Sequence, residues 1–338
     1  MYIVTGGSGM IGSALIHELN ERGISDILVV DRMGSSEKWK NLVKRSYLAY
    51  MHCDLFLEHI RRDSLEEALE REYVRGFPLG RIQGLVHLGA CSSTTEKDAD
   101  FLLRNNLEYS KTLCIYAQAR NIRYIQASSA ATYGDGSRGF ADDPDSLETL
   151  RPLNMYGYSK HLFDLWARRT GRLAALASVK FFNVYGPNEY HKGDMRSMAH
   201  KAMEQIRTEG RLRLFRSHRP EYPDGGQLRD FIYVKDCAAM LADLLQRPAC
   251  NGLFNLGTGQ ARSWNDLAAA IFAGLDQEAC IEYVDMPENL RGKYQYFTQA
   301  ETGRLKAALG PNTPAPRSME EGVTDYVRNY LMAEDAYL

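Results

Sequence analysis

One short segment constrains the fold more than any other part of the chain. The sequence TGGSGMIG (residues 5–12) spaces Gly6, Gly9 and Gly12 three apart, directly after the apolar run Tyr2–Thr5. An amphipathic helical pattern follows it through residue 19. Glycines between a strand and a helix let the backbone approach a pyrophosphate, and the helix N-terminus supplies N–H groups to bind it. The segment therefore predicts a dinucleotide-binding turn at the start of an α/β fold.

The first half of the chain alternates strands with helices. Buried strands are predicted at residues 27–30, 85–88, 124–127 and 176–182, and a helical stretch at 98–120. Such alternation predicts a parallel sheet with helices on both faces. Later, a helix that opens within Asp230–Asp236 and reaches about residue 246 precedes a strand at 252–257. We predict a Rossmann-type doubly wound sheet, formed by residues 1–182 plus about 231–262. A smaller, discontinuous α/β substrate lobe would comprise residues 183–230 plus 263–338.

Composition excludes several functional classes. The 338 residues carry a formal net charge of −2 and are 44% hydrophobic. Near-neutral charge leaves no electrostatic footprint for nucleic acid or an anionic membrane. No apolar run approaches the ~18 residues of a membrane helix, and the first residues show no signal-peptide pattern. We expect a cytoplasmic protein whose six scattered cysteines are reduced, with no metal site, because adjacent His52 and Cys53 lack ligand spacing.

The second predicted strand ends in Asp31, the position that binds the adenosine ribose in many dinucleotide sites. An acidic residue there is typical of NAD, because it accepts hydrogen bonds from the free ribose diol. Arg32 follows at once and Lys38 lies a few residues later, and such cations can accommodate a 2′-phosphate. We therefore predict NADP as the cofactor and regard NAD as the less favoured alternative.

Tyr156 and Lys160 are four residues apart in a helix-compatible stretch, so they share one face. An ammonium beside the phenol is expected to lower the pKa of Tyr156, which suits a tyrosine that exchanges a proton with an alcohol. Ser128 and Ser129 follow the predicted strand 124–127, where a hydroxyl could hold the substrate oxygen. A surface tyrosine and lysine would explain the pair alone, but the ordered set favours a reaction site.

This set resembles the extended short-chain dehydrogenase/reductase superfamily, and within it the ADP-L-glycero-D-manno-heptose 6-epimerases. The resemblance runs nearly from end to end. It is carried by TGGSGMIG (5–12), GACSSTTE (89–96), ASSAATYG (127–134), NMYGYSK (154–160), FFNVYGPNEYHKG (181–193), RDFIYVKD (229–236), FNLGTG (254–259) and RGKYQYFTQAE (291–301). GACSSTTE and the HKG segment are the specific ones, whereas TGGSGMIG and FNLGTG occur across the superfamily.

The resemblance implies an epimerase that acts on ADP-heptose at C6″ by transient oxidation to a ketone and reduction from the opposite face. It also implies one tightly bound NADP per subunit, a homo-oligomer that is a pentamer, and a role in lipopolysaccharide inner-core synthesis. Inversion needs proton exchange on two sides of the carbon, so a second acid/base across the pocket from the tyrosine is useful. From its position alone, Lys192 is either a second acid/base or a lysine that binds the diphosphate, and the resemblance implies the acid/base role.

The resemblance also implies individual site residues. The catalytic set comprises Tyr156, Lys192, Lys160 and Ser129. Cofactor contacts are expected at Gly6, Gly9, Met10, Ile11, Gly12, Asp31, Arg32, Lys38, Leu88, Gly89, Ala90, Cys91, Ser92, Asn105, Lys160, Val184 and Lys192. Substrate contacts are expected at Ser129, Asn183, Asp194, Lys201, Phe215, Arg216, Ser217, His218, Arg229 and Tyr294.

The chain departs from the family pattern at several positions. Cys53 stands where some members carry a lysine that helps to hold the 2′-phosphate, which weakens the NADP prediction. Asp194 replaces a familiar serine and Lys201 a familiar histidine, and residues 218–227 lengthen a loop. These differences affect the expected nucleotide contacts rather than the reaction class.

Rival functions are distinguished by particular residues. A 4,6-dehydratase would carry acidic residues after the serine, whereas Ser129 is followed by Ala-Ala-Thr. A C4 epimerase would use the same Ser, Tyr and Lys set, and only Lys192 and the GACSSTTE segment argue against it. A non-catalytic NADP-sensing regulator on this scaffold would have no need of Tyr156 and Lys160.

Overall fold

The computed structural model describes residues 1–73, 80–291, 294–311 and 313–338. Its main feature is a seven-stranded, wholly parallel sheet with the strand order β10-β6-β5-β4-β1-β2-β3, which confirms the predicted Rossmann-type fold. The strands are β1 (Tyr2–Thr5), β2 (Ile27–Asp31), β3 (Ala49–His52), β4 (Gly84–His87), β5 (Arg123–Ser129), β6 (Ala177–Phe181) and β10 (Gly252–Leu256). Strand β3 was not predicted.

The strand order reverses between β1 and β4. From β1 the chain builds outward to β2 and β3, and then crosses to β4 and continues to β5, β6 and β10. Ligands of such sheets bind in the crevice at the carboxyl ends of the strands where the order reverses. The glycine turn after β1 and the residues after β4 therefore meet at the place where a dinucleotide is expected.

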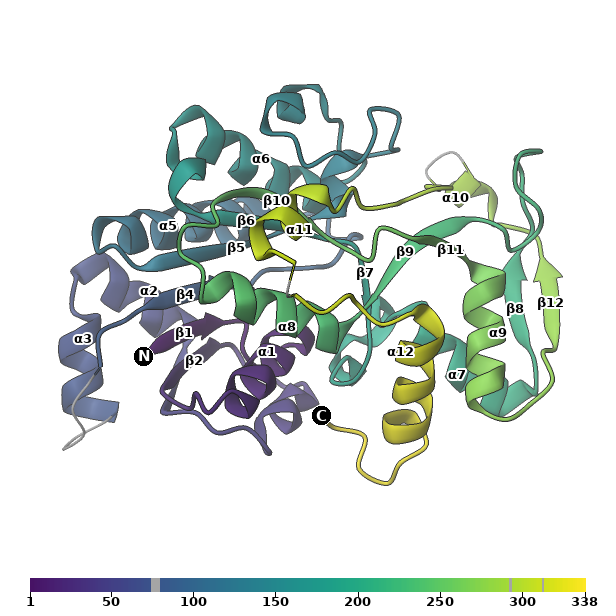
Figure 1. Ribbon diagram of the computed structural model, residues 1–338, viewed down its shortest axis with the longest axis horizontal. Helices are drawn as coiled ribbons and strands as arrows, with labels where there is room; N and C mark the ends of the chain where they lie inside the picture. Colours follow the sequence, from purple (N-terminus) through teal and green to yellow (C-terminus); the bar gives the residue numbers. More distant parts are fainter. Residues whose placement is uncertain (74–79, 292–293, 312) are drawn as a thin grey trace.

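Helices cover both faces of the sheet (Figure 1), and a separate hydrophobic core lies between the sheet and the helices on each face. The helices α1 (Met10–Glu21) and α8 (Val234–Leu245) pack on each other over one face, with α11 (Gly303–Leu309) beside α8. The other face carries α2 (Cys53–Arg62), α3 (Leu65–Ala68), α5 (Tyr109–Ala119) and α6 (Met155–Arg169). The predicted helical stretch 98–120 is continuous but changes its pitch, because a π-helical segment at Leu103–Glu108 joins α4 (Ala99–Leu102) to α5.

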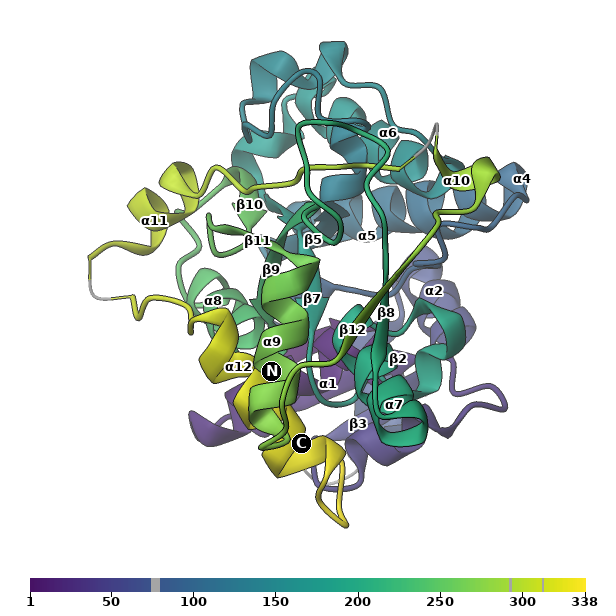
Figure 2. The ribbon, with the colours of Figure 1, turned by 90° about the vertical axis from the view of Figure 1, so that its right-hand side faces the viewer.

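Smaller sheets lie at one end of the molecule, on the right in Figure 1 and facing the viewer in Figure 2. One contains β7 (Asn183–Tyr185), β9 (Leu228–Tyr233) and β11 (Ala261–Ser263), and the other pairs β8 (Leu212–Phe215) with β12 (Ile281–Val284). They pack with α7 (Met198–Glu209), α9 (Trp264–Gly274) and α12 (Met319–Tyr326) around a third core, while α10 (Glu288–Arg291) follows β12. The predicted domain boundaries stay a prediction.

The segment Asp230–Asp236, which was predicted to open a helix, is divided between a strand and that helix. Residues 228–233 form strand β9, and the helix begins only at Val234. β9 pairs in parallel with β7 and antiparallel with β11, so its aromatic and β-branched residues bury against neighbouring strands. Strand β9 was not predicted, whereas the start of the helix lies within the predicted range.

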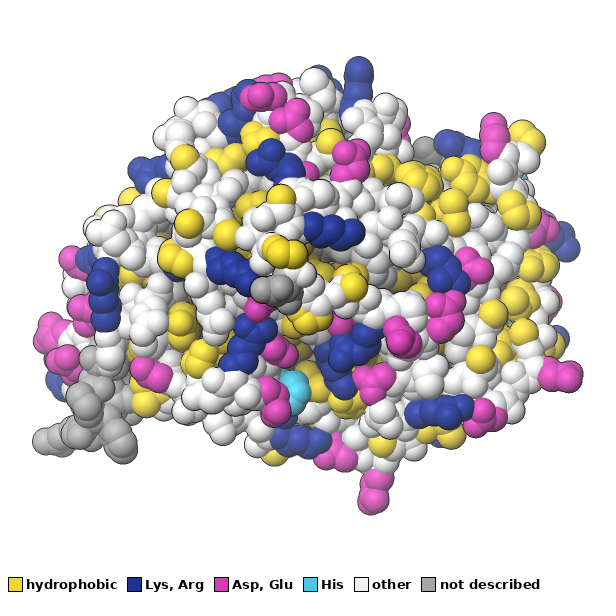
Figure 3. Space-filling model, in the orientation of Figure 1, with side chains coloured by type: hydrophobic (Ala, Val, Ile, Leu, Met, Phe, Trp, Pro, Cys, Tyr) yellow, Lys and Arg dark blue, Asp and Glu magenta, His cyan; other side chains and the backbone are white. Residues whose placement is uncertain are grey.

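Charged side chains of both signs are interspersed on the face displayed in Figure 3, which carries no large field of one sign. Among the described residues, no helix combines the length and apolar character needed to cross a bilayer.

Candidate active site

The glycine turn is packed so tightly that two of its positions exclude any side chain. Gly6 has φ of +69°, and a Cβ there would lie 2.6 Å from the backbone nitrogen of Gly89. A Cβ on Gly12 would lie 2.1 Å from the carbonyl oxygen of Gly6. No side chain caps the N-terminus of α1 at Gly9. The first-turn N–H groups and the positive end of the helix dipole are therefore suited to bind a pyrophosphate.

Two adjoining cavities extend from this turn. The larger, of about 440 Å³, lies along the glycine turn and reaches Tyr156, Lys160 and Lys192. The smaller, of about 260 Å³, lies beyond the end of β2 and includes Arg32, Cys53 and Asn105. Together they are lined by every predicted cofactor residue except Val184, which lies in a third cavity described below. Their combined shape, with an anion site between the two ends, fits a dinucleotide.

Asp31 accepts several hydrogen bonds. The backbone N–H and the hydroxyl of Ser8 donate to Oδ2 of Asp31, at 2.9 and 2.5 Å, and Lys38 Nζ lies 2.7 Å from Oδ1. Arg32 instead donates to the carboxylate of Asp54, at 2.9 and 3.1 Å. Both predicted phosphate ligands thus border the smaller cavity, and each is paired with a carboxylate.

His52 and Cys53 are adjacent in the chain, and for that reason no metal site was predicted there. The structure nevertheless gathers one ligand atom each from His52, Cys53 and Asp54 within 4.8 Å of one another. Arg32 already donates a hydrogen bond to Asp54, and exposed acidic groups commonly cluster without an ion. The grouping is therefore not evidence for a bound metal.

Tyr156 lies in the first turn of α6, in a rigid setting. Asn154 caps the helix by accepting a hydrogen bond from the N–H of Gly157 at 2.8 Å. A Cβ on Gly157 would lie 2.7 Å from the carbonyl oxygen of Ala131, so the helix packs directly on the segment after β5. This contact brings Tyr156 against Ser129, with which it forms a hydrogen bond.

The expectation that Lys160 lowers the pKa of Tyr156 was wrong. Burial raises the pKa of Tyr156, and the hydrogen bond with Ser129 only partly opposes it. Lys160 Nζ donates to the carbonyl oxygen of Ala127 at 2.8 Å, and its charge does not offset the burial of the phenol. Burial lowers the pKa of Lys160 itself to about 8, against the attraction of Asp164.

Lys192 lies in a short helical turn at residues 190–195, which is broken at Gly193 with φ of 53° and ψ of −127°. The lysine is half-buried, and burial lowers its pKa while Glu189 raises it. Its Nζ lies 3.9 Å from the sulfur of Met10, at the start of α1. The loop therefore brings an amine of lowered basicity against the cofactor cavity.

Glu189 anchors this loop and is fully buried. Its carboxylate accepts hydrogen bonds from the hydroxyl of Ser197 at 2.7 Å and from the phenol of Tyr326 at 3.0 Å. Ser197 begins α7 and Tyr326 ends α12, so one carboxylate ties the loop to two helices.

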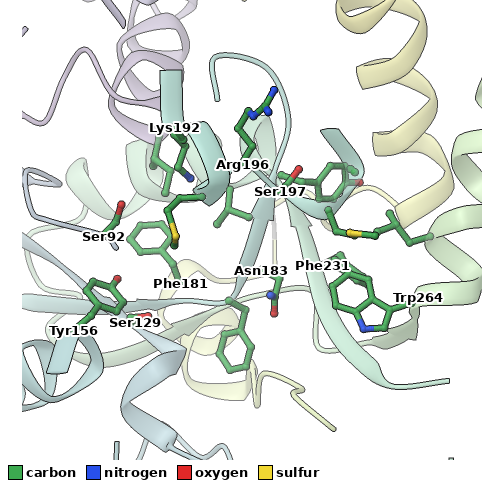
Figure 4. Close-up of a pocket in the computed structure, with 18 residues that line it drawn as sticks. Ser92, Ser129, Tyr156, Phe181, Asn183, Lys192, Arg196, Ser197, Phe231 and Trp264 are labelled. Atoms are coloured by element: carbon green, nitrogen blue, oxygen red, sulfur yellow. The ribbon is translucent and has the colours of Figure 1, made fainter. Parts of the chain in front are cut away.

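A third cavity, of about 370 Å³, joins the cofactor cavity to the smaller sheets. Tyr156 and Lys192 line both cavities, and Figure 4 shows them entering from opposite sides, with Ser92 and Phe181 nearby. Asn183 and Trp264 lie farther from the cofactor side. The lining consists of Ile11, Ser92, Ser129, Tyr156, Phe181, Phe182, Asn183, Val184, Tyr185, Lys192, Met195, Arg196, Ser197, Met198, Ala199, Phe231, Trp264 and Leu267.

Of the predicted substrate residues, only Ser129 and Asn183 line this cavity. Arg229 and Tyr294 lie behind it, next to the lining residue Trp264. The guanidinium of Arg229 lies 5.3 Å from the ring centre of Tyr294 and 5.7 Å from that of Trp264. The phenol of Tyr294 accepts a hydrogen bond from the indole of Trp264 at 2.9 Å, and Phe215 contacts Tyr294 edge-on. These residues form an aromatic and cationic wall.

The other predicted substrate residues lie apart from the cavity. Lys201 donates to the backbone oxygen of Asp194, whose side chain is exposed. Arg216, Ser217 and His218 begin the long loop after β8, where the N–H of His218 donates to the phenol of Tyr296. Gly292 and Lys293, which belong to the RGKYQYFTQAE segment, lie outside the described residues.

Sequence reasoning missed several residues of the site. Phe181, Phe182 and Trp264 form its apolar walls, and no spacing pattern marks them. Glu189 was missed because one of its partners, Tyr326, is remote in the chain. Asp164 could have been found, since it lies four residues after Lys160 and so shares its helix face.

A protein-family model, described as the NAD dependent epimerase/dehydratase family, matches residues 2–257. Among curated proteins, an ADP-L-glycero-D-manno-heptose-6-epimerase of Nitratidesulfovibrio vulgaris is 57% identical over 338 residues, covering 100% of both chains. One of the same name from Fusobacterium nucleatum is 46% identical over 347 residues, again covering 100% of both.

Solved structures share the fold at lower identity. The Helicobacter pylori ADP-L-glycero-D-manno-heptose-6-epimerase superposes with a TM-score of 0.76 at 23% identity, covering 97% of this chain and 95% of that one. The Thermus thermophilus UDP-glucose 4-epimerase, solved as a complex with NAD, gives 0.74 at 22% identity, covering 98% and 99%.

Proposed function

Because the chain belongs to the NAD dependent epimerase/dehydratase family, and its cofactor is therefore a nicotinamide dinucleotide, we propose that its substrate is ADP-glycero-manno-heptose. It interconverts the D-glycero and L-glycero epimers at C6″. Full-length relatives at 57% and 46% identity, named as epimerases of this sugar, support the substrate. The observation that carries the proposal is the position of Tyr156 and Lys192, which line both cavities from opposite sides.

The chemistry that a bound nicotinamide supplies is reversible hydride transfer. The residues of this chain move the accompanying proton. Tyr156 and Lys192 exchange it with the C6″ oxygen, one in each half-reaction. C6″ lies outside the sugar ring, so rotation about C5–C6 presents the other face of the planar ketone while the nucleotide stays bound. Ser129 holds the oxygen on the tyrosine side, and the wall of Trp264, Arg229 and Tyr294 closes the far end of the pocket.

Hydride transfer is favoured over proton abstraction because the C6″ hydrogen sits on a carbinol carbon with no adjacent carbonyl. Its acidity is negligible, so neither Tyr156 nor Lys192 could remove it as a proton at neutral pH. Epimerisation in D₂O should therefore leave no deuterium at C6″, and substrate deuterated at C6″ should keep its label within one molecule. Solvent deuterium at C6″ in the mass spectrum would overturn this mechanism.

The substrate is tested by comparing ADP-D-glycero-D-manno-heptose with a UDP-hexose. Conversion of the ADP-heptose alone is expected. Conversion of the UDP-hexose alone would replace the proposal with C4 epimerisation, which uses the same Ser129, Tyr156 and Lys160. Failure of both, with cofactor bound, would favour a non-catalytic role.

NADP is the proposed form of the cofactor. Arg32 and Lys38 both border the cavity beyond Asp31, where a 2′-phosphate would lie. Nucleotide extracted from the purified protein should be NADP, and it should survive gel filtration, since an epimerase gains nothing by releasing a cofactor used in both directions. Extraction of NAD alone would contradict this form.

The setting of the reaction is also part of the proposal. We propose that the protein acts in lipopolysaccharide heptose synthesis, in the cytoplasm, as a homo-oligomer, and the heptose in the relatives' names supports the first of these. Light scattering of the purified protein tests the assembly. A pentamer is expected, and a monomer would contradict the proposed homo-oligomer.

A further inference from the structure

A buried cluster of charged side chains lies beneath the reaction site. Its centre is Asp164, one helical turn after Lys160 on α6, with no exposed surface. The hydroxyl of Ser128 donates to Oδ2 of Asp164 and the hydroxyl of Ser178 to Oδ1, both at 2.6 Å. The ammonium of Lys180 lies 4.0 Å from Oδ2. A buried carboxylate is tolerated only when it is hydrogen-bonded and paired in this way.

Asp164 joins α6 to the two strands that carry the site. Ser128 lies on β5 and lines the cofactor cavity, whereas Ser178 and Lys180 lie on the neighbouring β6. The carbonyl oxygen just before Ser128 receives the hydrogen bond of Lys160. The end of β5 is therefore held by both the lysine and the carboxylate of one helix face.

A second branch of the cluster reaches Tyr156 by another route. Lys180 donates to the hydroxyl of Thr132 at 2.8 Å, and Thr132 donates to the backbone oxygen of Ser129 at 2.8 Å. Ser129 in turn hydrogen-bonds with Tyr156. Asp164 is thus linked to both members of the Tyr-x-x-x-Lys pair without touching either cavity.

Two buried ammonium groups share this one carboxylate. Burial lowers the pKa of Lys160 to about 8 and that of Lys180 to about 8, and in each case the attraction of Asp164 is the main opposing cause. The other titratable groups that face the two lysines or Asp164 are His87 and Cys91 near Lys160, Asp142 and Tyr133 near Lys180, and His161 beside Asp164.

We propose that Asp164 is a positioning residue for the reaction, which holds the cavity end of β5 through Ser128 and places a buried carboxylate one helical turn from Lys160. This inference rests on the proposed function of Lys160 at the site. Neither cavity lining includes Asp164, so it acts through Lys160 and Ser128 rather than on the substrate.

The test is a titration of Lys160 in the full-length protein, followed by NMR of ¹³Cε-labelled lysine and assigned with Lys160→Met. The attraction of Asp164 opposes the loss of the proton from Lys160, so Asp164→Asn should lower the midpoint for Lys160, by about one pH unit. The matched control is Asp142→Asn, which removes another buried carboxylate near Lys180 and should leave that midpoint unchanged. An unchanged midpoint in folded Asp164→Asn overturns the proposal.

If Asp164→Asn fails to fold, Lys180→Met decides instead. Removing the ammonium of Lys180 leaves the carboxylate of Asp164 to Lys160 alone, so the titration midpoint of Lys160 should rise. A midpoint that does not rise overturns the proposal. The alkaline limb of the epimerisation rate against pH should move with the midpoint in each variant. A shifted NMR midpoint in a protein that converts no ADP-heptose would count against the proposed function and not against the role of Asp164.

Discussion

The two amines of the site are supported by different kinds of structure. Lys160 and Lys192 both have a pKa lowered by burial, and each is attracted by a buried carboxylate, Asp164 for the first and Glu189 for the second. Lys160 and Asp164 lie on one regular helix over the parallel sheet. Lys192 lies in a loop whose position depends on contacts with α7 and α12. The carboxylate is close to its lysine in sequence in both cases, but a regular helix positions Lys160, whereas tertiary contacts position Lys192.

Removing either acid/base group should have the largest effect, because inversion requires both. Tyr156→Phe and Lys192→Met should each reduce the epimerisation rate by about 10²–10⁴-fold from either epimer, while circular dichroism stays unchanged. Tyr158→Phe, two residues along the same helix and 46% exposed, is the matched control and should be near normal. A Lys192→Met enzyme with normal kcat and only a raised KM would assign Lys192 to substrate binding.

Glycine substitutions should distinguish the role of the glycine turn, which binds the cofactor, from the role of the loop that carries Lys192. Gly12→Ala forces a Cβ into the Gly6 carbonyl, so it should cost up to about 3 kcal/mol of stability and abolish cofactor binding. A Cβ at Gly193 would meet no atom within 4 Å, but the φ of +53° is strained for alanine. Gly193→Ala should therefore lower the free energy of unfolding by about 1 kcal/mol or slightly more.

Urea unfolding and calorimetric titration with NADP measure both glycine variants. Gly193→Ala should retain cofactor affinity and lose rate. Equal loss of cofactor affinity in the two variants would show that the loop belongs to the cofactor site as much as the glycine turn does.

Glu189→Gln should loosen the Lys192 loop without disturbing the cofactor cavity at the glycine turn. The change weakens hydrogen bonds to a charged acceptor, each of which contributes about 1.5–3 kcal/mol. We expect kcat to fall by about tenfold or more at unchanged cofactor affinity, measured by steady-state kinetics and calorimetry. Glu204→Gln, on the exposed side of α7, is the control. Loss of cofactor binding in Glu189→Gln would mean that the two sides are not independent.

The smallest expected effect concerns Lys180 and stability. Burial lowers the pKa of Lys180 in the folded protein to about 8, from the ordinary lysine value of 10.5, so above pH 8 the unfolded state binds more protons. The free energy of unfolding of the wild type should therefore rise relative to Lys180→Met by about 1–2 kcal/mol between pH 8 and 9.5. Urea unfolding at the two pH values measures the difference, and a constant difference would place the pKa of Lys180 outside this window.

Much of the cofactor side could be predicted because its signals are local. The glycine spacing, the acidic end of β2 and the four-residue interval of Tyr156 and Lys160 each depend on one turn or one helix. The pKa of Tyr156 could not be predicted, since it depends on where Lys160 Nζ points, toward Ala127. Strand β9 was not predicted, because it exists only by pairing with strands that come from other parts of the chain.

By itself, the sequence determined the parallel α/β fold, the dinucleotide turn and the Tyr-x-x-x-Lys pair, because backbone sterics and helix periodicity act over a few residues. Only the tertiary structure decided that Lys192 faces Tyr156 across a cavity and that Glu189 is held by Ser197 and Tyr326. Burial and long-range hydrogen bonds have no fixed sequence interval. They arise from the packing of segments that can lie far apart in the chain, as Glu189 and Tyr326 do, and no local pattern records them.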